Sequence, residues 1–339
     1  MKKRLIYLQS GFWEKIKKRD SVLDKRIFWD LYGALECGTI IADIPEKMWE
    51  KDELLYYLQQ GKYDGNGGEI IETGPHEIEE ALDSSKKQPV DNLCAVYLLD
   101  KDNINCDGLS KQQGILCLNV EMLVQNNKYV RGCAAMYSKG DVFDGFSKCK
   151  QHFNIPCNSL LIIDPYIAKK RESIEKNLIP ILDAILPVSL HNIKFHITIM
   201  CETDNCFMKK NEEPLKNEKI KEYIENQIRT IREKLDISFT LCSIKTTGNG
   251  DGDFHSRHIL TNNMLINSED GFDLFGWNRN EKKVVCGKHA RLEFLIPSLM
   301  DNRRMDAENY YRWMHIASKN SKSDDSWGTH ENRLFELVD

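Results

Sequence analysis

The chain contains 339 residues, of which 41% are hydrophobic and 29% charged, and this composition is typical of a globular protein with a sizeable core. The length predicts two domains, because single domains usually hold about 100 to 200 residues. The formal net charge is −5, and acidic residues slightly outnumber basic ones in both halves of the chain. This balance excludes a uniformly basic nucleic-acid binder, so any contact with nucleic acid needs a local cluster of Lys and Arg.

Eleven cysteines are scattered along the chain without a C-x-x-C pair. Their odd number, their positions inside apolar runs and the absence of a signal peptide predict reduced thiols in a cytoplasmic protein. No apolar run approaches the roughly 20 residues that span a bilayer. We therefore expect a soluble protein without a transmembrane segment.

The first half of the chain alternates strands with helices. Strands are expected at residues 4–8, 38–45, 92–102 and 114–119, and helices at residues 22–35, 48–61 and 76–85. The helix at 22–35 follows from apolar residues that recur every three to four positions. A short polar connection is expected between the last two strands. This order predicts an α/β sandwich-type domain over residues 1–152.

Three aspartates stand at the ends of these expected strands, namely Asp43, Asp100 and Asp102. Carboxylates that meet at one edge of a sheet are the ligands that Mg²⁺ prefers. The pattern faintly resembles a PIN-type nuclease, although the first strand runs into YLQSGFW without the aspartate that a PIN domain places there. Turns also favour aspartate, so acidic strand ends without a metal are the alternative. No other cofactor is expected.

The segment 146–158 lies between two apolar strands and is the expected domain boundary, so the second domain covers residues 153–339. Strands are expected at residues 159–164, 192–200 and 236–245, then as a pair within 258–266 and at 284–296. Helices are expected at residues 172–187, 217–235 and 306–318, followed by a polar tail. Asp164 ends the first of these strands and precedes a proline, which cannot continue a central ladder. Ligands of such sheets bind at the carboxyl ends of the strands, which makes Asp164 a candidate site residue.

Residues 253–275 carry the pattern H-x-R-x4-N, formed by His255, Arg257 and Asn262, after a glycine-rich turn. Side chains two residues apart on a strand point to the same face, so His255 and Arg257 are expected to face one ligand. A histidine can attack phosphorus as a nucleophile, and the fork of an arginine pairs two phosphate oxygens. These residues predict a site for a phosphate-containing ligand.

This spacing resembles the H-x-K-x4-D motif of the phospholipase D superfamily, with Arg in place of Lys and Asn in place of Asp. The H-x-R start, the TNN step and the closing GFDLF are more similar still to the phospholipase-D-like C-terminal domain that follows MIT domains, and to its bacterial relatives. The resemblance covers about residues 155–339 and implies a phospholipase D-like α/β domain. It also implies phospholipid-binding relatives in animals and bacterial relatives in anti-phage modules.

Active members of that superfamily carry two motifs, whereas this chain shows one, and the neutral Asn262 cannot stabilise an imidazolium. We therefore expect a bacterial defence protein that binds an anionic, phosphate-containing ligand or a partner protein, with no or weak catalysis. Nucleic acid and a phospholipid headgroup are the candidate ligands. One alternative is a phosphodiesterase or nuclease in which His255 is the nucleophile, completed by a homodimer or by His258 or His289 as second acid. Another is a metal-dependent nuclease in the first domain.

Overall fold

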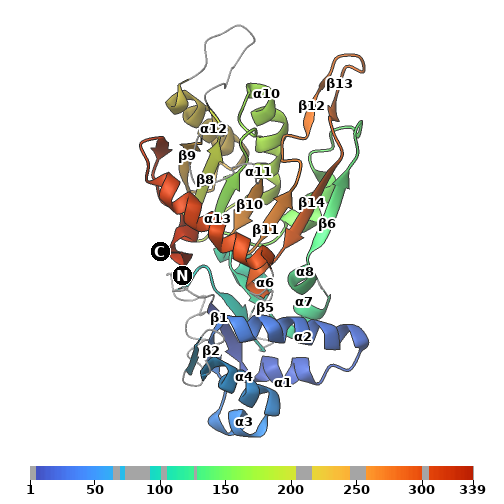
Figure 1. Ribbon diagram of the computed structural model, residues 1–339, viewed down its shortest axis with the longest axis vertical. Coiled ribbons are helices and arrows are strands. Elements are labelled where there is room, and N and C mark those ends of the chain that lie inside the picture. The colour runs from blue at the N-terminus through green and yellow to red at the C-terminus, as the bar shows by residue number, and fades with distance from the viewer. Residues whose placement is uncertain are drawn as a thin grey trace.

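The structure is a computed structural model that describes residues 5–63, 69–72, 92–100, 105–125, 128–203, 216–244, 257–299 and 305–338. Its core consists of two large β-sheets with helices packed on them, which confirms the expected α/β fold class (Figure 1). The residues up to 125 build an N-terminal lobe around the smaller sheet, and the residues from 128 build a C-terminal lobe around the larger one.

The sheet of the N-terminal lobe is parallel and has the strand order β3-β2-β1-β4-β5. Its strands are β1 (Leu5–Gln9), β2 (Thr39–Asp43), β3 (Ile70–Glu72), β4 (Val96–Leu98) and β5 (Leu116–Leu118). The helices of this lobe are α1 (Ser10–Lys17), α2 (Val22–Cys37), α3 (Glu46–Lys51), α4 (Glu53–Tyr63), α6 (Cys106–Gln113) and α7 (Val120–Gln125). The start of α2 is fixed by Ser21, whose side chain accepts a hydrogen bond from the backbone N–H of Asp24 at 3.0 Å.

The sheet of the C-terminal lobe has the order β15-β9-β8-β7-β10-β11-β14-β6. Three central strands are parallel to one another, namely β7 (Ser159–Ile163), β8 (Phe195–Cys201) and β9 (Ile237–Ser243). The remaining strands run antiparallel to their neighbours, namely β6 (Cys133–Tyr137), β10 (His258–Thr261), β11 (Leu265–Ser268), β14 (Ala290–Leu295) and β15 (Ser326–Gly328). A separate ribbon is formed by β12 (Phe275–Asn278) and β13 (Lys283–Cys286).

Helices cover both faces of this sheet. Along β7, Leu160 and Ile162 belong to the core under α11 (Ile179–Ile185) and α12 (Asn217–Ile231). The alternate residues Leu161 and Ile163 belong to a second core under α13 (Met305–Ser321). Every residue of β7 is buried, as expected for a central parallel strand with helices on both sides.

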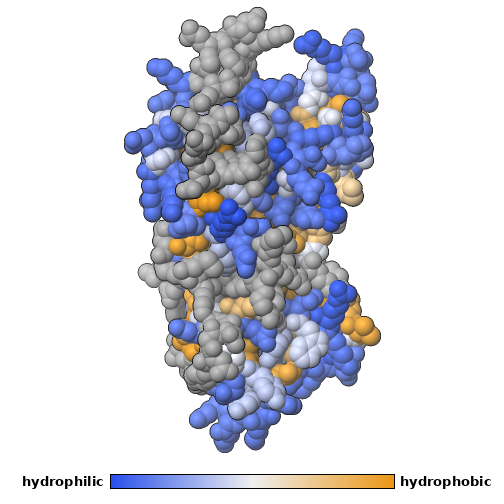
Figure 2. All heavy atoms as spheres, in the orientation of Figure 1, coloured by the Kyte–Doolittle hydropathy of each residue, from blue (hydrophilic) through white to orange (hydrophobic). Residues whose placement is uncertain are grey.

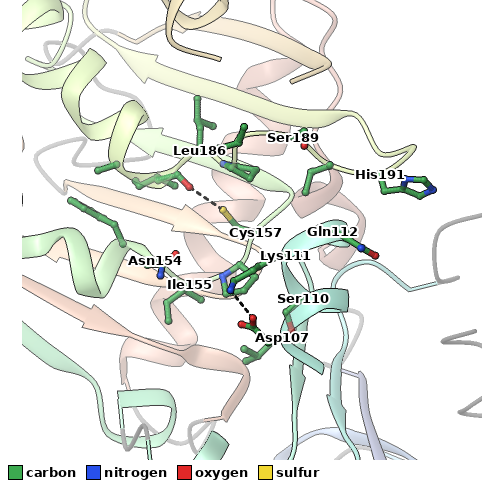
Figure 3. A pocket seen from close by; sticks show the side chains of 18 of the residues that line it. Asp107, Ser110, Lys111, Gln112, Asn154, Ile155, Cys157, Leu186, Ser189 and His191 are labelled. Carbon is green, nitrogen blue, oxygen red and sulfur yellow. Dashed lines mark hydrogen bonds and ion pairs between the residues drawn. The ribbon is translucent and has the colours of Figure 1, made fainter. Parts of the chain in front are cut away.

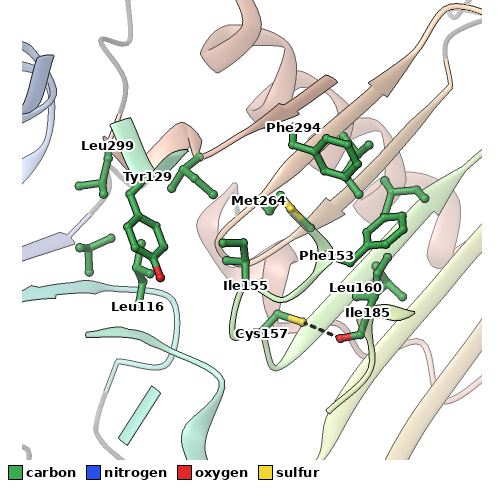
Figure 4. Packing of buried hydrophobic residues seen from close by; sticks show 14 of the residues in the cluster. Leu116, Tyr129, Phe153, Ile155, Cys157, Leu160, Ile185, Met264, Phe294 and Leu299 are labelled. Atoms are coloured by element: carbon green, nitrogen blue, oxygen red, sulfur yellow. Dashed lines mark hydrogen bonds between the residues drawn. The ribbon is translucent and has the colours of Figure 1, made fainter. Parts of the chain in front are cut away.

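The two lobes share one continuous apolar core (Figure 4). Tyr129 of α8 (Lys128–Arg131) and Leu116 of β5 lie close to the group around Ile155, Phe153 and Phe294, which belongs to the C-terminal lobe. The helix α2 also contacts the 3-10 turn η3 (Pro297–Leu299). The chain changes sheets between β5 and β6, before the expected boundary at residue 153, because β6 pairs with β14. The division into domains 1–152 and 153–339 stays a prediction.

Three expectations about local structure are wrong. The supposedly short polar connection before β5 contains the helix α6, which begins after the N-cap Asn105 and ends at Gly114 with φ of 64°. The single strand expected at 284–296 is two strands, β13 and β14. The polar tail contains β15 and the 3-10 helix η4 (Arg333–Leu337), in which Leu334 and Phe335 are buried. The helix expected at 76–85 lies outside the described residues.

On the face shown in Figure 2, the described surface is mostly hydrophilic and apolar side chains are scattered in small groups. Among the described residues, no helix combines the length and the apolar character that crossing a bilayer requires.

Candidate functional site

Asp164 and Arg257 lie next to each other at the C-terminal edge of the three parallel strands. The antiparallel register places His258 opposite Ile163, so Arg257, the residue before β10, lies beside Asp164, the residue after β7. Both residues therefore lie at one edge of the sheet, and their use of a common ligand stays a prediction. We call Asp164, Tyr166, Arg257 and the loop 268–275 the strand-end site.

The guanidinium of Arg257 is half-buried and held from two sides. Its Nη1 donates to the carbonyl oxygen of Glu269 at 2.6 Å, and its Cζ lies 5.4 Å from the centre of the Tyr166 ring. Its buried Nε has no hydrogen-bond partner among the described residues. No described carboxylate forms an ion pair with this guanidinium, Asp164 included. The site therefore contains a cation that is partly removed from water and forms no direct ion pair within the described part of the chain.

The carboxylate of Asp164 holds the loop of the site. It is 1% exposed and accepts from the backbone N–H of Tyr166 at 2.8 Å and of Phe272 at 2.7 Å, one bond on each oxygen. Burial raises the pKa of this carboxyl, while the two amide bonds and the nearby Arg257 and Lys288 oppose the rise. Because both oxygens already accept backbone bonds, Asp164 positions the loop and leaves Arg257 as the group open to a ligand.

A second side chain, Asn177, holds the same loop. Its Oδ1 accepts from the backbone N–H groups of Leu274 at 3.0 Å and Phe275 at 2.8 Å, and its Nδ2 donates to Asp273 at 2.9 Å. It lies on the π-helical segment η2 (Ile174–Leu178), just before Pro180, which has no N–H to donate to the preceding turn. The sequence analysis missed Asn177, although a polar residue within an apolar helical stripe was a usable signal.

Gly271 allows the close packing at this site. Its φ is +83°, and a Cβ there would lie 2.7 Å from Cδ of Arg257 and 3.1 Å from Oδ2 of Asp164. A larger residue would therefore push the arginine away from its place in addition to straining the backbone.

Asn262 does not belong to the strand-end site. It follows β10 at the end away from Arg257, and residues five apart on a strand are separated by about 16 Å. Its Nδ2 donates to the carbonyl oxygen of Gly114 at 2.8 Å and of Leu93 at 3.3 Å, and its Oδ1 accepts from the backbone N–H of Asn158 at 2.9 Å. Asn262 thus joins the two lobes.

Two neighbours join the lobes in the same way, and we call Asn158, Asn262 and Asn263 the asparagine cluster. The Nδ2 of Asn158 donates to Leu93 at 2.8 Å and to Gly114 at 3.1 Å, and that of Asn263 donates to Gly114 at 3.3 Å. All three residues are buried, with exposures of 0%, 3% and 0%. Buried amides that meet several backbone carbonyls in this way satisfy polar groups that would otherwise be costly.

The other candidates from the sequence are placed as follows. His255 and Asp102 lie outside the described residues. His258 faces α13, where its Nδ1 donates to Asn267 at 2.7 Å and its ring lies 5.1 Å from Trp313. Alternation along β10 puts it on the opposite face from Arg257. Burial lowers the pKa of His258. It is therefore not placed to act as a second acid beside Arg257.

Asp43 and Asp100 stand at the ends of β2 and beyond β4, with β1 between them. The backbone N–H of Asp100 donates to Gln9 at 3.0 Å, and its carboxylate is 2.5 Å from Nζ of Lys15. Over the described residues, no group of three or more His, Cys, Asp or Glu side chains is arranged to hold a metal ion. The magnesium site stays a prediction.

A cavity of about 770 Å³ lies between the lobes, under α6 and the segments 153–157 and 184–191 (Figure 3). Its charged lining residues Lys111 and Asp107 pair with each other at 2.6 Å. The remaining titratable groups of the lining include the exposed His191, whose backbone N–H donates to Gln112 across the lobe junction. The cavity lies beside the contact between the lobes, and the charged residues of its lining are paired, so the strand-end site is the better candidate.

A comparison with protein-family models finds no family that matches the chain, and a search of curated proteins finds no match. The candidate site therefore rests on the geometry of this chain.

Proposed function

We propose that this protein binds an anionic, phosphate-containing ligand at the strand-end site, through Arg257, with no or weak catalysis. The observation that carries the proposal is the state of the Arg257 guanidinium, which is half-buried, has an unsatisfied Nε and lacks a carboxylate partner among the described residues. Partial burial of a cation that has no direct ion pair is unfavourable, and an arriving phosphate would reduce that cost by accepting charge-assisted N–H bonds.

The position of the site supports the same ligand class. The ends of β7, β8 and β9 form the C-terminal edge of a parallel sheet, where ligands of α/β proteins bind. Lys288 adds positive charge nearby, since it opposes the rise in the pKa of both Asp164 and Asp273. The resemblance to the phospholipase D superfamily and its MIT-associated relatives, together with the single H-x-R motif, favours binding over turnover.

The test measures binding of inorganic phosphate and of the phosphodiester bis(4-nitrophenyl) phosphate by isothermal titration calorimetry. Arg257→Ala is expected to weaken phosphate binding by about 1.5 to 3 kcal/mol, or roughly 10- to 150-fold, the range for charge-assisted hydrogen bonds. Arg279→Ala, which removes an exposed arginine from the turn between β12 and β13, is the matched control and should leave affinity unchanged. Equal affinity of wild type and Arg257→Ala would show that the site is not used.

The same phosphodiester reports the alternative function, because its hydrolysis releases a coloured product. Hydrolysis that disappears in His255→Ala and persists in Arg279→Ala would establish the phosphodiesterase reading, with His255 as the nucleophile. Single-stranded DNA and vesicles that contain phosphatidylinositol then separate nucleic acid from a lipid headgroup as the source of the phosphate. The roles in bacterial defence and in the cytoplasm stay predictions of the resemblance and of the cysteine pattern.

A further inference from the structure

A thiol and an imidazole form a close pair at the edge of the larger sheet. The Sγ of Cys133, the first residue of β6, lies 2.9 Å from Nδ1 of His152 on α9 (Lys150–Phe153). Both residues are half-buried, so the pair is partly open to solvent. This arrangement lies outside the strand-end site and is independent of the proposed function.

The local packing fixes the geometry of the pair. The ring of His152 lies 5.0 Å from the ring of Phe294 with a tilt of 34°, and Phe294 is the cross-strand neighbour of Cys133 on β14. Gly132, with φ of +70°, precedes the cysteine, and a Cβ there would lie 2.8 Å from the carbonyl oxygen of Phe294. One aromatic ring therefore supports the imidazole from the strand next to the thiol, and a glycine permits the close approach of the two strands.

We propose that Cys133 and His152 form a thiol–imidazole pair that takes up low-molecular-weight disulfides by thiol–disulfide exchange. The thiol proton moves to Nδ1 of His152, and the thiolate attacks one sulfur of the disulfide. A new S–S bond joins Cys133 to that sulfur while the original S–S bond breaks. The released thiolate takes the proton from the imidazolium, so Cys133 is oxidised to a mixed disulfide and the other sulfur of the reagent is reduced to a thiol.

Several other cysteines of the chain differ from Cys133 in being held as buried thiols. Burial raises the pKa of Cys149 to about 11 and that of Cys157 and Cys242 to about 12. Cys106 is 2% exposed and Cys117 is 0% exposed, so reagents in solution do not reach them. Compared with these buried thiols, Cys133 combines partial exposure with a base at hydrogen-bond distance, so we expect exchange there.

The charged and titratable groups on the surrounding elements do not replace His152 as the base. On β14, Glu293 points to the other face of the strand and pairs with Arg291 at 2.6 Å. On the 3-10 turn η1 (Ser147–Cys149), Lys148 pairs with Asp141 at 2.6 Å, and Cys149 shares a hydrogen bond with Tyr137 at 3.5 Å. Lys150 at the start of α9 is exposed to solvent.

The first test follows the alkylation rate of Cys133 in the full chain with iodoacetamide between pH 5.5 and 10, by peptide mass spectrometry. His152→Gln is expected to shift the midpoint of the pH profile upward by about two units, toward the ordinary thiol value near 8.5. A thiolate of higher pKa is the stronger nucleophile but is less populated at low pH. We therefore expect alkylation of the variant to be about tenfold slower at pH 6 and several-fold faster at pH 10. The crossing of the two profiles is a signature that general loosening of the structure does not produce.

The second test incubates the protein with glutathione disulfide at pH 7 and locates the mixed disulfide by mass spectrometry. The adduct is expected at Cys133, absent from Cys133→Ser, reversible with dithiothreitol and unchanged in His191→Gln, which removes an exposed histidine elsewhere. An identical alkylation profile in wild type and His152→Gln overturns the proposal. If that variant does not fold, a wild-type profile with the ordinary midpoint overturns it instead, as does an adduct spread over several cysteines.

Discussion

Replacing Asn262 by aspartate restores the carboxylate of the H-x-K-x4-D motif, yet the structure predicts that Asn262→Asp destabilises the protein. The amide Nδ2 donates to the carbonyl oxygens of Gly114 and Leu93, whereas Oδ1 accepts from the N–H of Asn158. A carboxylate can replace the acceptor but not the donor, and it would bring a negative oxygen to two carbonyl oxygens in a buried place. The new side chain must therefore either carry a buried charge or bind a proton.

The cost of binding the proton limits the size of the effect. An aspartic acid with an ordinary pKa of about 3.9 requires roughly 4 kcal/mol to be protonated at pH 7, at 1.36 kcal/mol for each pH unit. Its O–H can then donate to only one carbonyl, so a second bond worth about 1 kcal/mol is lost. We expect a loss of about 4 to 5 kcal/mol in the free energy of unfolding at pH 7. Leaving the charge buried would cost several kcal/mol in desolvation and would add repulsion from the two carbonyl oxygens, so we expect the carboxyl to be protonated.

The sign of the pH dependence follows from the same reasoning. The introduced carboxyl would have a pKa in the folded state above that in the unfolded state, so stability decreases as pH rises. The loss should fall to about 2 to 3 kcal/mol at pH 5. Asn262→Ala, in contrast, should cost about 1 to 2 kcal/mol at every pH, because Asn158 still donates to both carbonyls.

The assay is urea unfolding at pH 5, 6 and 7, followed by far-UV circular dichroism. Asn280→Asp is the matched control, because it adds the same charge at an exposed turn and should change stability by less than about 0.5 kcal/mol. The reasoning fails if Asn262→Asp unfolds at the wild-type urea concentration at pH 7. It also fails if the loss is the same at pH 5 and pH 7.

Gly271→Ala should lower the melting temperature more than Gly140→Ala and should also weaken phosphate binding. Both glycines have positive φ, +83° at Gly271 and +92° at Gly140, but of the two only Gly271 would place the added Cβ against Arg257, at 2.7 Å from its Cδ. Equal decreases in melting temperature for the two variants would contradict this reasoning. The Nδ1 atom of His196 accepts a hydrogen bond from the backbone N–H of Arg333 at 2.9 Å, and burial lowers the pKa of His196 to about 4. The stability that neutral His196 contributes is therefore present above about pH 6.5 and is lost as pH falls toward 4. His196→Asn retains an acceptor that does not titrate, so the variant should lose less stability as pH falls. We expect the loss in the wild type to be no more than about 2 kcal/mol, because the ring is partly exposed to solvent. An unchanged dependence of stability on pH in the variant would exclude His196 as the source of the loss.

Sequence patterns predicted the elements whose period is strong. The helix at 217–231 has one apolar stripe, with Ile220, Ile224 and Ile228 buried, and the fully apolar strand 159–163 lies at the centre of the sheet as expected. These two predictions succeeded because the spacing of apolar residues reports which side chains are buried.

The elements that were missed lack a strong apolar period or depend on distant contacts. The helix 106–113 is mostly polar, so its sequence signals are its capping residues Asn105 and Gly114. The structure of the tail 326–337 was missed because it depends on contacts with α13 and with β9, which is distant in the sequence, and its few apolar residues form no regular pattern. The hydrogen bonds of Asn177 to the loop 268–275 bridge nearly a hundred residues, so no local pattern contains them.

Asn262 stands where the H-x-K-x4-D pattern has an aspartate, and its amide has a structural role in this protein. Around this position the chain presents carbonyl oxygens from the N-terminal lobe on one side and a backbone N–H on the other. An amide satisfies both sides at once, because it is donor and acceptor, and a carboxylate satisfies only one. The contact between the lobes therefore accounts for the amide of Asn262, and this amide gives no information about the strength of a nucleophile. The phosphate site that we propose lies at the other end of β10, where Arg257 has no partner for its Nε among the described residues.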